Sequence, residues 1–159
     1  PDGAYRILIE ESKTEIIKKL EELRTLIQTG KLRPWEFSGI KTILITAKSS
    51  KTISPRAKDM RVAEVFAGIF PKTAVLDKIL KKYNVSLDEI CFIGDDLVDL
   101  SLMRKVGLPV AVANASSEIK EAALYITNRS GGRGAVSEIA ELILKSQGKW
   151  KDILGFYGA

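Results

Sequence analysis

The sequence predicts an α/β fold: a doubly wound, mostly parallel sheet with helices on both faces, in three layers. Short apolar segments rich in β-branched residues alternate along the chain with longer segments whose apolar residues recur at helical spacing. This alternation favours parallel pairing, because parallel strands must be joined by a crossover, which is usually a helix. One apolar segment also ends in a cluster of acidic residues, and open α/β sheets bind their ligands at the carboxyl ends of strands.

The N-terminal part of the chain is predicted to hold a strand and a long helix. Residues 5–9 are apolar and β-branched enough for a strand. Ser12 and Glu15 then have the spacing of a capping box, and apolar residues follow at helical spacing until Gly30. Residues 31–39 contain proline, tryptophan and glycine and are expected to form a connector.

The rest of the chain continues the alternation. Residues 42–46 are typical of a fully buried strand. An apolar segment covers residues 62–66, and further strands are expected over 90–94, 109–113 and 124–127. Helices are expected over residues 57–61, 75–83, 100–106, 118–123 and 134–146. No repeat or low-complexity linker interrupts this pattern, so the sequence predicts a single domain over residues 1–159.

The composition is that of an ordinary soluble globular protein, with 45% hydrophobic and 28% charged residues. A cytoplasmic location is expected, because no membrane-spanning run or signal-peptide pattern is present and the single cysteine, Cys91, allows no disulfide within the chain. The net charge of +5 is spread along helices among glutamates, which does not favour a nucleic-acid partner. Histidine is absent, so His-based zinc sites and Ser-His or Cys-His catalysis are excluded.

The strongest candidate site is the acidic end of the strand at 90–94. Asp95 and Asp96 follow Gly94 directly, and Asp99 comes three residues later. Clustered carboxylates repel one another unless a cation lies among them, and Mg²⁺ prefers oxygen ligands of this kind. The alternative is an acidic helix start, and Asp99 suits such a cap because a helical apolar pattern follows it. Capping explains one aspartate better than three, so the metal site is favoured.

Three further features are candidates on weaker grounds. Thr46 ends its strand as Asp95 ends another, so both are expected at one edge of the sheet, where a hydroxyl can donate to a phosphate oxygen. Lys72 precedes a helix and is well placed to offset anionic charge. The loop Gly131–Gly134, which carries Arg133, is either a phosphate-binding loop or a tight turn into a helix. The alternatives are a strand-end turn for Thr46 and an ordinary surface lysine for Lys72.

The order of Thr46, Lys72 and the aspartates on successive strand ends resembles motifs two to four of the haloacid dehalogenase (HAD) superfamily of phosphatases. The segments 94–99, 103–115 and 131–136, with Glu138 and the tail 147–149, are similar to the 3-deoxy-D-manno-octulosonate 8-phosphate phosphatase family. The resemblance extends over roughly residues 40–150.

The resemblance implies an HAD-like Rossmannoid fold without a large cap domain, and Mg²⁺-dependent hydrolysis of a phosphomonoester through an aspartyl-phosphate. Asp95 would hold the metal, supported by Asp96 and Asp99. Thr46 and Lys72 would hold phosphate oxygens, and they are the catalytic candidates together with Glu10. Arg133 and the tail 147–149 would contact the sugar. Members of the family are homotetramers in which neighbouring subunits help to close each site, so self-association is expected.

The sequence departs from the family at the nucleophile, because it contains no Asp-x-Asp. In one account, Pro1–Gly3 matches the residues that follow the family's first strand, and the strand itself is missing. In the other, residues 6–9 are the first strand, Glu10 replaces the nucleophile and Ser12 replaces the acid. Glutamate is one methylene longer than aspartate, and such a displacement is costly in an in-line reaction.

Two functions therefore remain open. The first is a phosphatase of an acidic keto-sugar phosphate, either 3-deoxy-manno-octulosonate 8-phosphate or a sialic-acid-type 9-phosphate, whose activity is impaired if Glu10 replaces the nucleophile. The second is a non-catalytic HAD-like module for binding or oligomerisation, such as the C-terminal part of an acylneuraminate cytidylyltransferase-type protein.

Overall fold

The computed structural model describes residues 38–49, 57 and 61–158 of the 159-residue chain. The elements expected over residues 5–9 and 12–29 lie outside these residues, as does most of the helix expected over 57–61. None of the helices in the described part is long and apolar enough to cross a membrane.

The described residues form five short strands at the centre of the fold, and all their pairings are parallel. They are β1 (Ile43–Ile45), β2 (Glu64–Phe66), β3 (Cys91–Gly94), β4 (Leu108–Ala111) and β5 (Tyr125–Ile126). Each overlaps one of the apolar segments identified in the sequence, with β4 beginning one residue before the expected 109–113, so the predicted parallel α/β architecture is confirmed.

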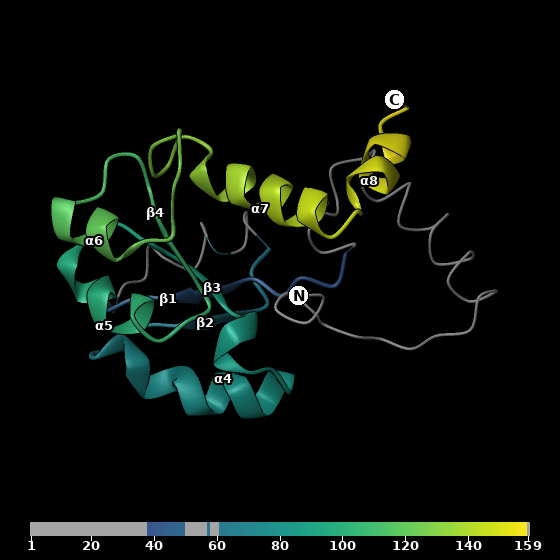
Figure 1. Cartoon of the computed structure of the whole chain (residues 1–159). Coiled ribbons are helices and arrows are strands. Elements are labelled where there is room, and N and C mark those ends of the chain that lie inside the picture. The colour runs from purple at the N-terminus through teal and green to yellow at the C-terminus, as the bar shows by residue number, and fades with distance from the viewer. Residues whose placement is uncertain (1–37, 50–56, 58–60, 159) are drawn as a thin grey trace.

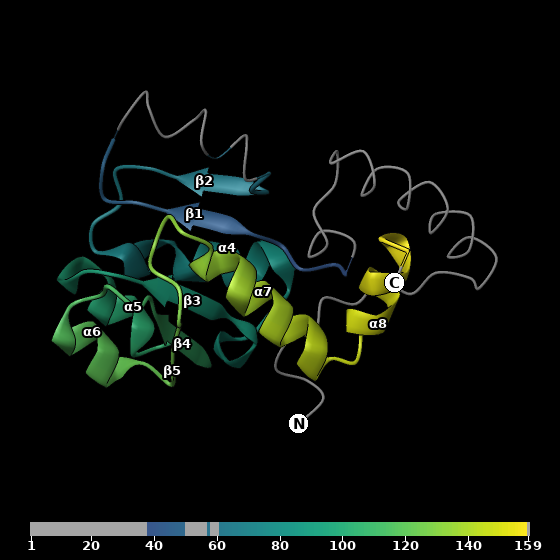
Figure 2. The same cartoon turned by 90° about the horizontal axis from the view of Figure 1, so that it is seen from above.

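The sheet differs from the prediction in one respect: within the described residues it is divided in two. Strands β1 and β2 form one sheet, and β3, β4 and β5 form the other in that order. Figure 2 shows the strands in the spatial order β2, β1, β3, β4, β5, so that β1 and β3 are the inner strands of the two sheets.

The helices alternate with the strands and cover both faces (Figure 1). Helix α4 (Leu76–Tyr83) follows the short 3₁₀ helix η1 (Lys72–Val75) on one face, and α7 (Ala135–Ser146) covers the opposite face. The remaining helical elements are η2 (Leu87–Glu89), η3 (Leu97–Asp99), α5 (Leu100–Met103), α6 (Ser117–Ala122) and α8 (Trp150–Phe156). The result is the expected three-layer arrangement.

Two helices differ from their predicted bounds. The helix expected over residues 100–106 is a 3₁₀ turn followed by a single α-helical turn that ends at Met103. Helix α8 was not predicted at all, although Ile153 and Phe156 lie three residues apart and are both buried. No helix was predicted here because the apolar pattern covers only two turns.

The core lies in clusters on both faces of the sheets. Leu76 and Leu102 pack with Ile45 of β1 and Phe92 of β3, so a single cluster contacts both sheets. On the opposite face, Ile139 of α7 packs in a cluster that also reaches Cys91 and Ile93 of β3. The helical layers therefore hold the two sheets together.

A close backbone contact fixes the turn into β4. A Cβ atom added to Gly107 would lie 2.3 Å from the carbonyl oxygen of Asp88 in η2, and no side chain fits there. The amide of Gly107 also donates to the carbonyl oxygen of Leu87 at 2.8 Å. Glycine at this position thus lets the chain enter β4 directly against η2.

Candidate active site

The candidate site is built on the turn that follows β3. The side chain of Asp96 accepts a hydrogen bond from the amide of Leu97 at 2.7 Å and begins η3. The carboxylate of Asp99 reaches back to accept from the amides of Asp95 at 2.9 Å and Asp96 at 3.3 Å. Asp96 and Asp99 thus form a reciprocal capping box, which satisfies amides that would otherwise be unpaired at the helix start.

Asp99 is buried and bound to a lysine from another element. Only 2% of its side chain is exposed, and its Oδ1 accepts a hydrogen bond from the Nζ of Lys72, whose side chain is 11% exposed. Lys72 begins η1, in the loop after β2, and its Nζ also lies 5.8 Å from the centroid of the Phe92 ring. This pair joins the carboxyl end of β2 to the carboxyl end of β3, so the strands of both sheets end at one edge of the molecule.

Asp95 presents its side chain at this edge. Its carbonyl oxygen accepts from the amide of Ser116 at 3.1 Å, which ties the turn to the loop after β4. Partial burial, followed by the hydrogen bond and the charge of Asp99, raises the pKa of the Asp95 carboxyl above its usual range, although Lys72 acts in the opposite direction. The charged form of Asp95 is therefore short of compensating positive charge.

Thr46 lies at the carboxyl end of β1, as predicted. Its carbonyl oxygen accepts from the amide of Ile69 at 3.0 Å, in the loop that leads to Lys72. Its Oγ1 accepts from the amide of Lys48 at 3.1 Å, a local turn contact. The structure therefore places Thr46 and Lys72 on connected loops at the same edge, and the threonine hydroxyl has the turn role that was its alternative interpretation.

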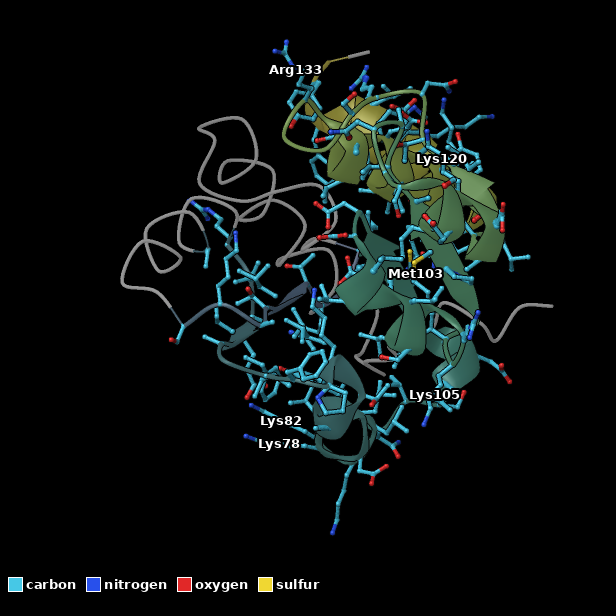
Figure 3. The ribbon with its side chains drawn as sticks, turned by 90° about the vertical axis from the view of Figure 1, so that its left-hand side faces the viewer. Lys78, Lys82, Met103, Lys105, Lys120 and Arg133 are labelled. Atoms are coloured by element: carbon cyan, nitrogen blue, oxygen red, sulfur yellow. The ribbon has the colours of Figure 1, made fainter. Side chains whose placement is uncertain are left out.

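Arg133 lies in the loop between β5 and α7. Figure 3 shows its side chain at the outer surface at one end of the molecule, whereas Lys78 and Lys82 project at the other end. The amide of Gly131, in the same loop, donates to Oδ1 of Asn114 at 2.8 Å, in the loop that also contacts Asp95. The loop of Arg133 is thus anchored beside the candidate site, while its arginine points into solvent.

Glu138 holds this loop in place. Its Oε1 accepts from the hydroxyl of Tyr125 at 3.0 Å and the amide of Asn128 at 2.8 Å, and its Oε2 accepts from the amide of Arg129 at 3.0 Å. The bond from the Asn128 amide, followed by the other contacts, lowers the pKa of the Glu138 carboxyl. The sequence motif contained Glu138, but its spacing did not show that the residue acts as the anchor of the loop.

Two of the predicted site elements, Glu10 and the tail 147–149, are not part of this arrangement among the described residues. Glu10 is outside the described residues. In the tail 147–149, the Nζ of Lys149 donates to the carbonyl oxygen of Ser38 at 3.0 Å, ahead of the amino end of β1. Within this chain the tail therefore lies away from the edge that carries Asp95.

The three aspartates are not arranged as a ready-made metal cage. Within the part of the chain that the structure describes, no group of three or more His, Cys, Asp or Glu side chains could hold a metal ion together. Both oxygens of Asp99 are used by Lys72 and by backbone amides, and one oxygen of Asp96 caps η3. Asp95 and Asp96 are exposed, so they are the two of the three carboxylates that a cation could reach.

Comparison with known proteins places this arrangement in a family. The family model described as haloacid dehalogenase-like hydrolase matches residues 45–139, a range that includes Thr46, Lys72, Asp95 and Glu138. The chain belongs to the haloacid dehalogenase-like hydrolase family. The predicted relationship to this superfamily is therefore confirmed.

Relatives of this HAD-like chain carry one recurrent name. The chain is 35% identical over 118 residues to the 3-deoxy-D-manno-octulosonate 8-phosphate phosphatase of Salmonella typhi, and this match covers 74% of the chain and 63% of that protein. The Escherichia coli K12 enzyme of the same name matches with the same identity and coverage. The chain thus spans less than two thirds of the length of these relatives.

Solved structures agree with the fold. The Moraxella catarrhalis 3-deoxy-D-manno-octulosonate 8-phosphate phosphatase, in complex with magnesium, phosphate and a KDO molecule, matches with a TM-score of 0.73 and 34% identity over 77% of this chain and 71% of that one. The cobalt-bound Haemophilus influenzae phosphatase matches with a TM-score of 0.66 and 29% identity over 70% of this chain and 66% of that one. Both support the HAD-like fold assigned to this chain.

Proposed function

We propose that this HAD-like chain is a Mg²⁺-dependent phosphomonoester hydrolase that acts on an acidic keto-sugar phosphate. The observation that carries the proposal is the meeting of Lys72 with the Asp95–Asp99 turn at the carboxyl edge of the strands. The lysine, from the loop after one strand, can bind a phosphate dianion, and the carboxylates, from the loop after another, can bind a cation beside it. The names of the relatives support the substrate class.

The metal would be held at Asp95, with Asp96 beside it. Asp95 fits this role because its raised pKa reflects burial and the nearby Asp99 carboxylate, and a bound divalent cation relieves both effects. When bound, Mg²⁺ reduces the charge repulsion between a phosphate dianion and an attacking carboxylate. The third predicted ligand, Asp99, would act by fixing the turn, because its oxygens bind Lys72 and two backbone amides.

Lys72 would stabilise the phosphoryl group. Its Nζ donates to Asp99 and retains further donors, and its burial against Phe92 strengthens its interaction with an anion. Thr46 would donate from the neighbouring strand end, and Arg133 would reach the sugar carboxylate from its anchored loop. Glu10 remains the proposed nucleophile within this chain.

Phosphate release is the direct test. The full chain is incubated with and without Mg²⁺ with 3-deoxy-manno-octulosonate 8-phosphate, with a sialic-acid-type 9-phosphate and with an aryl phosphate. We expect Mg²⁺-dependent release, and the ratio of the two kcat/KM values for the sugars identifies the substrate. Asp95→Asn should abolish the release and weaken Mg²⁺ binding in calorimetric titration.

The matched control is Asp152→Asn, because Asp152 is an exposed carboxylate on α8. It should leave both Mg²⁺ binding and turnover unchanged. Absence of phosphate release at high protein concentration, with the fold confirmed by circular dichroism, rejects the phosphatase and favours the non-catalytic module. Light scattering on the same sample tests the proposed homotetramer.

A further inference from the structure

The loop over residues 112–116, which follows β4, bonds to the turns on both sides of it. On the β3 side, the amide of Ser116 donates to the carbonyl oxygen of Asp95 at 3.1 Å. On the β5 side, the amide of Ala113 donates to the carbonyl oxygen of Arg129 at 3.3 Å. Because β4 lies between β3 and β5, this loop connects the acidic turn to the loop that leads into α7.

Core packing fixes the base of this connection. Val112 and Ala115 are buried in one cluster with Ala135, the first residue of α7. The amide of Ala115 also donates to the carbonyl oxygen of Val112 at 2.9 Å, which closes a turn. The loop 112–116 is therefore a fixed support for Asn114, its exposed residue.

The loop over residues 128–134, called the arginine loop from here on, is held at its start but has a glycine-rich tip. Its first two amides donate to the carboxylate of Glu138. At the tip, Gly131, Gly132 and Arg133 are exposed, and Gly132 has a φ of 74°, in the region that favours glycine. Glycine keeps broad backbone freedom, so such a tip needs a tether to hold one conformation.

The side chain of Asn114 supplies this tether. Its Oδ1 accepts a hydrogen bond from the amide of Gly131 at 2.8 Å. Asn114 belongs to the same loop as Ser116, whose amide binds the carbonyl oxygen of Asp95. One asparagine thus joins the tip of the arginine loop to the support that contacts the acidic turn.

The two ends of this connection carry opposite charges. Asp95 and Asp96 are exposed carboxylates after β3, and Arg133 is an exposed cation after β5, the second strand along (Figure 3). Neighbouring strands lie about 4.8 Å apart, so the ends of β3 and β5 are about 10 Å apart. A sugar phosphate with a carboxylate at its far end can therefore meet a metal at the aspartates and the arginine together.

We propose that Asn114 is a positioning residue for substrate choice: by fixing the tip of the arginine loop, it holds Arg133 where the guanidinium pairs with the carboxylate of an acidic keto-sugar. An arginine on a preorganised loop loses less conformational entropy on binding than one on a free loop. A guanidinium–carboxylate pair is directional, so it depends on this placement. This role rests on the proposed function, because it needs a sugar acid at the site.

Hydrogen exchange tests whether Asn114 holds the tip. Asn114→Ala removes the acceptor, and the amide of Gly131 should then exchange about fivefold faster, the factor that corresponds to one net hydrogen bond. Ser117→Ala is the matched control, because Ser117 is an exposed residue just beyond the loop 112–116 and its hydroxyl donates to Glu118. It should leave the exchange of Gly131 unchanged.

Binding of free sugar acids separates the sugar end of the site from the phosphate end and needs no turnover. The full chain is titrated, with Mg²⁺ present, with 3-deoxy-manno-octulosonate, with a sialic acid and with inorganic phosphate. Asn114→Ala should raise the Kd of the sugar acid that binds by about fivefold and leave the Kd of phosphate unchanged. Ser117→Ala should change neither value.

A double variant tests whether Asn114 acts through Arg133. Arg133→Ala should weaken sugar-acid binding about tenfold or more, as expected for a hydrogen-bonded charge. Once Arg133 is replaced, Asn114→Ala should add little further loss, because the two residues act as one unit.

Turnover gives a readout that a merely structural role would not produce. Asn114→Ala should raise the KM of the sugar phosphate about fivefold with kcat unchanged, since it removes binding that the ground state and the transition state share. Hydrolysis of an aryl phosphate that has no carboxylate should be unaffected. If the chain releases no phosphate but binds a sugar acid with the losses given above, the phosphatase is rejected and the role of Asn114 is supported.

Three results would overturn the proposal. Equal exchange of the Gly131 amide in the unaltered chain and in Asn114→Ala shows that the asparagine does not hold the tip. Failure of the unaltered chain to bind either sugar acid shows that the arginine loop takes no such ligand. Fully additive losses in the double variant show that Asn114 does not act through Arg133.

Discussion

At the residue scale, the Lys72–Asp99 pair determines what the other site residues can do. Asp99 uses one oxygen for Lys72 and the other for the amides of Asp95 and Asp96, so it shapes the turn. This arrangement leaves the exposed carboxylates of Asp95 and Asp96 to meet a ligand. A buried ion pair is costly to form, and removing one partner leaves an uncompensated buried charge.

Lys72→Ala should therefore destabilise the protein strongly. We expect a loss of about 3–5 kcal/mol in the free energy of unfolding, since Asp99 would keep a buried charge without its partner. Urea denaturation followed by circular dichroism measures the loss. Lys78→Ala is the control, because the side chain of Lys78 is 65% exposed and lies 3.9 Å from Glu64. Exposed ion pairs contribute at most about 1 kcal/mol. If the free energies of unfolding of the two variants differ by less than this amount, the prediction is wrong.

The thiol of Cys91 should be nearly unreactive in the native protein. Burial raises its pKa to about 12, so at pH 8 only about one thiol in ten thousand is the reactive thiolate. We expect reaction with a disulfide reagent to be slow at pH 8 and to accelerate tenfold for each unit of pH while the fold persists. Equal rates for native and urea-unfolded protein would show that Cys91 is accessible.

At the element scale, Glu138 closes the loop between β5 and α7 by accepting hydrogen bonds from three residues. Its lowered pKa means that its stabilising effect is present above its unfolded pKa and is lost as pH falls through the folded value. Glu138→Gln should lower the Tm at neutral pH, and the difference from the unaltered chain should shrink below about pH 4.5, the usual value for this group.

The control for this loop anchor is Glu141→Gln, a helix-surface residue paired with Lys145 at 2.7 Å. Such i,i+4 pairs contribute only a few tenths of a kcal/mol, so its Tm should change little at any pH. If the Tm of Glu138→Gln is lowered by the same amount at every pH, the negative charge of Glu138 is not what stabilises the loop, and the prediction is wrong.

Two glycines test the packing of neighbouring elements. Gly107→Ala should destabilise the protein by about 1–3 kcal/mol, the range for overpacked sites, because the new Cβ would meet backbone atoms of Asp88. Gly155→Ala in α8 meets no atom within 4 Å, so it should stabilise by about 0.5–1 kcal/mol through helix propensity. Chemical denaturation of the two variants side by side measures both effects, and equal shifts would contradict the contact at Gly107.

The sequence predicted strands more reliably than the exact helices. Parallel strands are short apolar runs: β3 begins one residue later than expected, and β4 (Leu108–Ala111) begins one residue and ends two residues earlier than the expected 109–113. Helix α5 is shorter than expected: it ends at Met103, and residues 104–107 form a turn that leads to the close contact of Gly107 with η2. Helix α8 was not predicted because its burial depends on contact with α7, and the local sequence pattern cannot show such a contact.

The candidate site was predicted in outline and not in detail. The positions of Thr46 and Asp95 at strand ends followed from the general rule for open α/β sheets, whereas Lys72 joined them only through the family resemblance; the structure gathers their loops at one edge. The separate roles of the three aspartates could not be predicted from the sequence, because they depend on a long-range contact between Lys72 and Asp99. Only the capping-box spacing of Asp96 and Asp99 could have indicated it.

At the scale of the whole molecule, the two sheets should unfold together. The cluster of Leu76 and Leu102 contacts Ile45 and Phe92, so neither sheet keeps its core without the other. We expect a single cooperative unfolding transition in urea. As urea is added, hydrogen exchange of the Leu44 and Val110 amides should report the same free energy of global unfolding. Two separate exchange isotherms would show that the sheets are independent units.

The Lys72–Asp99 pair also limits how this protein could be redesigned. Because the same two side chains form a buried ion pair and belong to the proposed phosphate site, changes there would trade the proposed activity against folding yield. The loop of Arg133 is anchored separately, through Glu138 and Asn114, and its arginine is exposed. If the proposed sugar contact of Arg133 holds, libraries that vary this loop should alter substrate preference without loss of expression, which makes it the place to begin engineering.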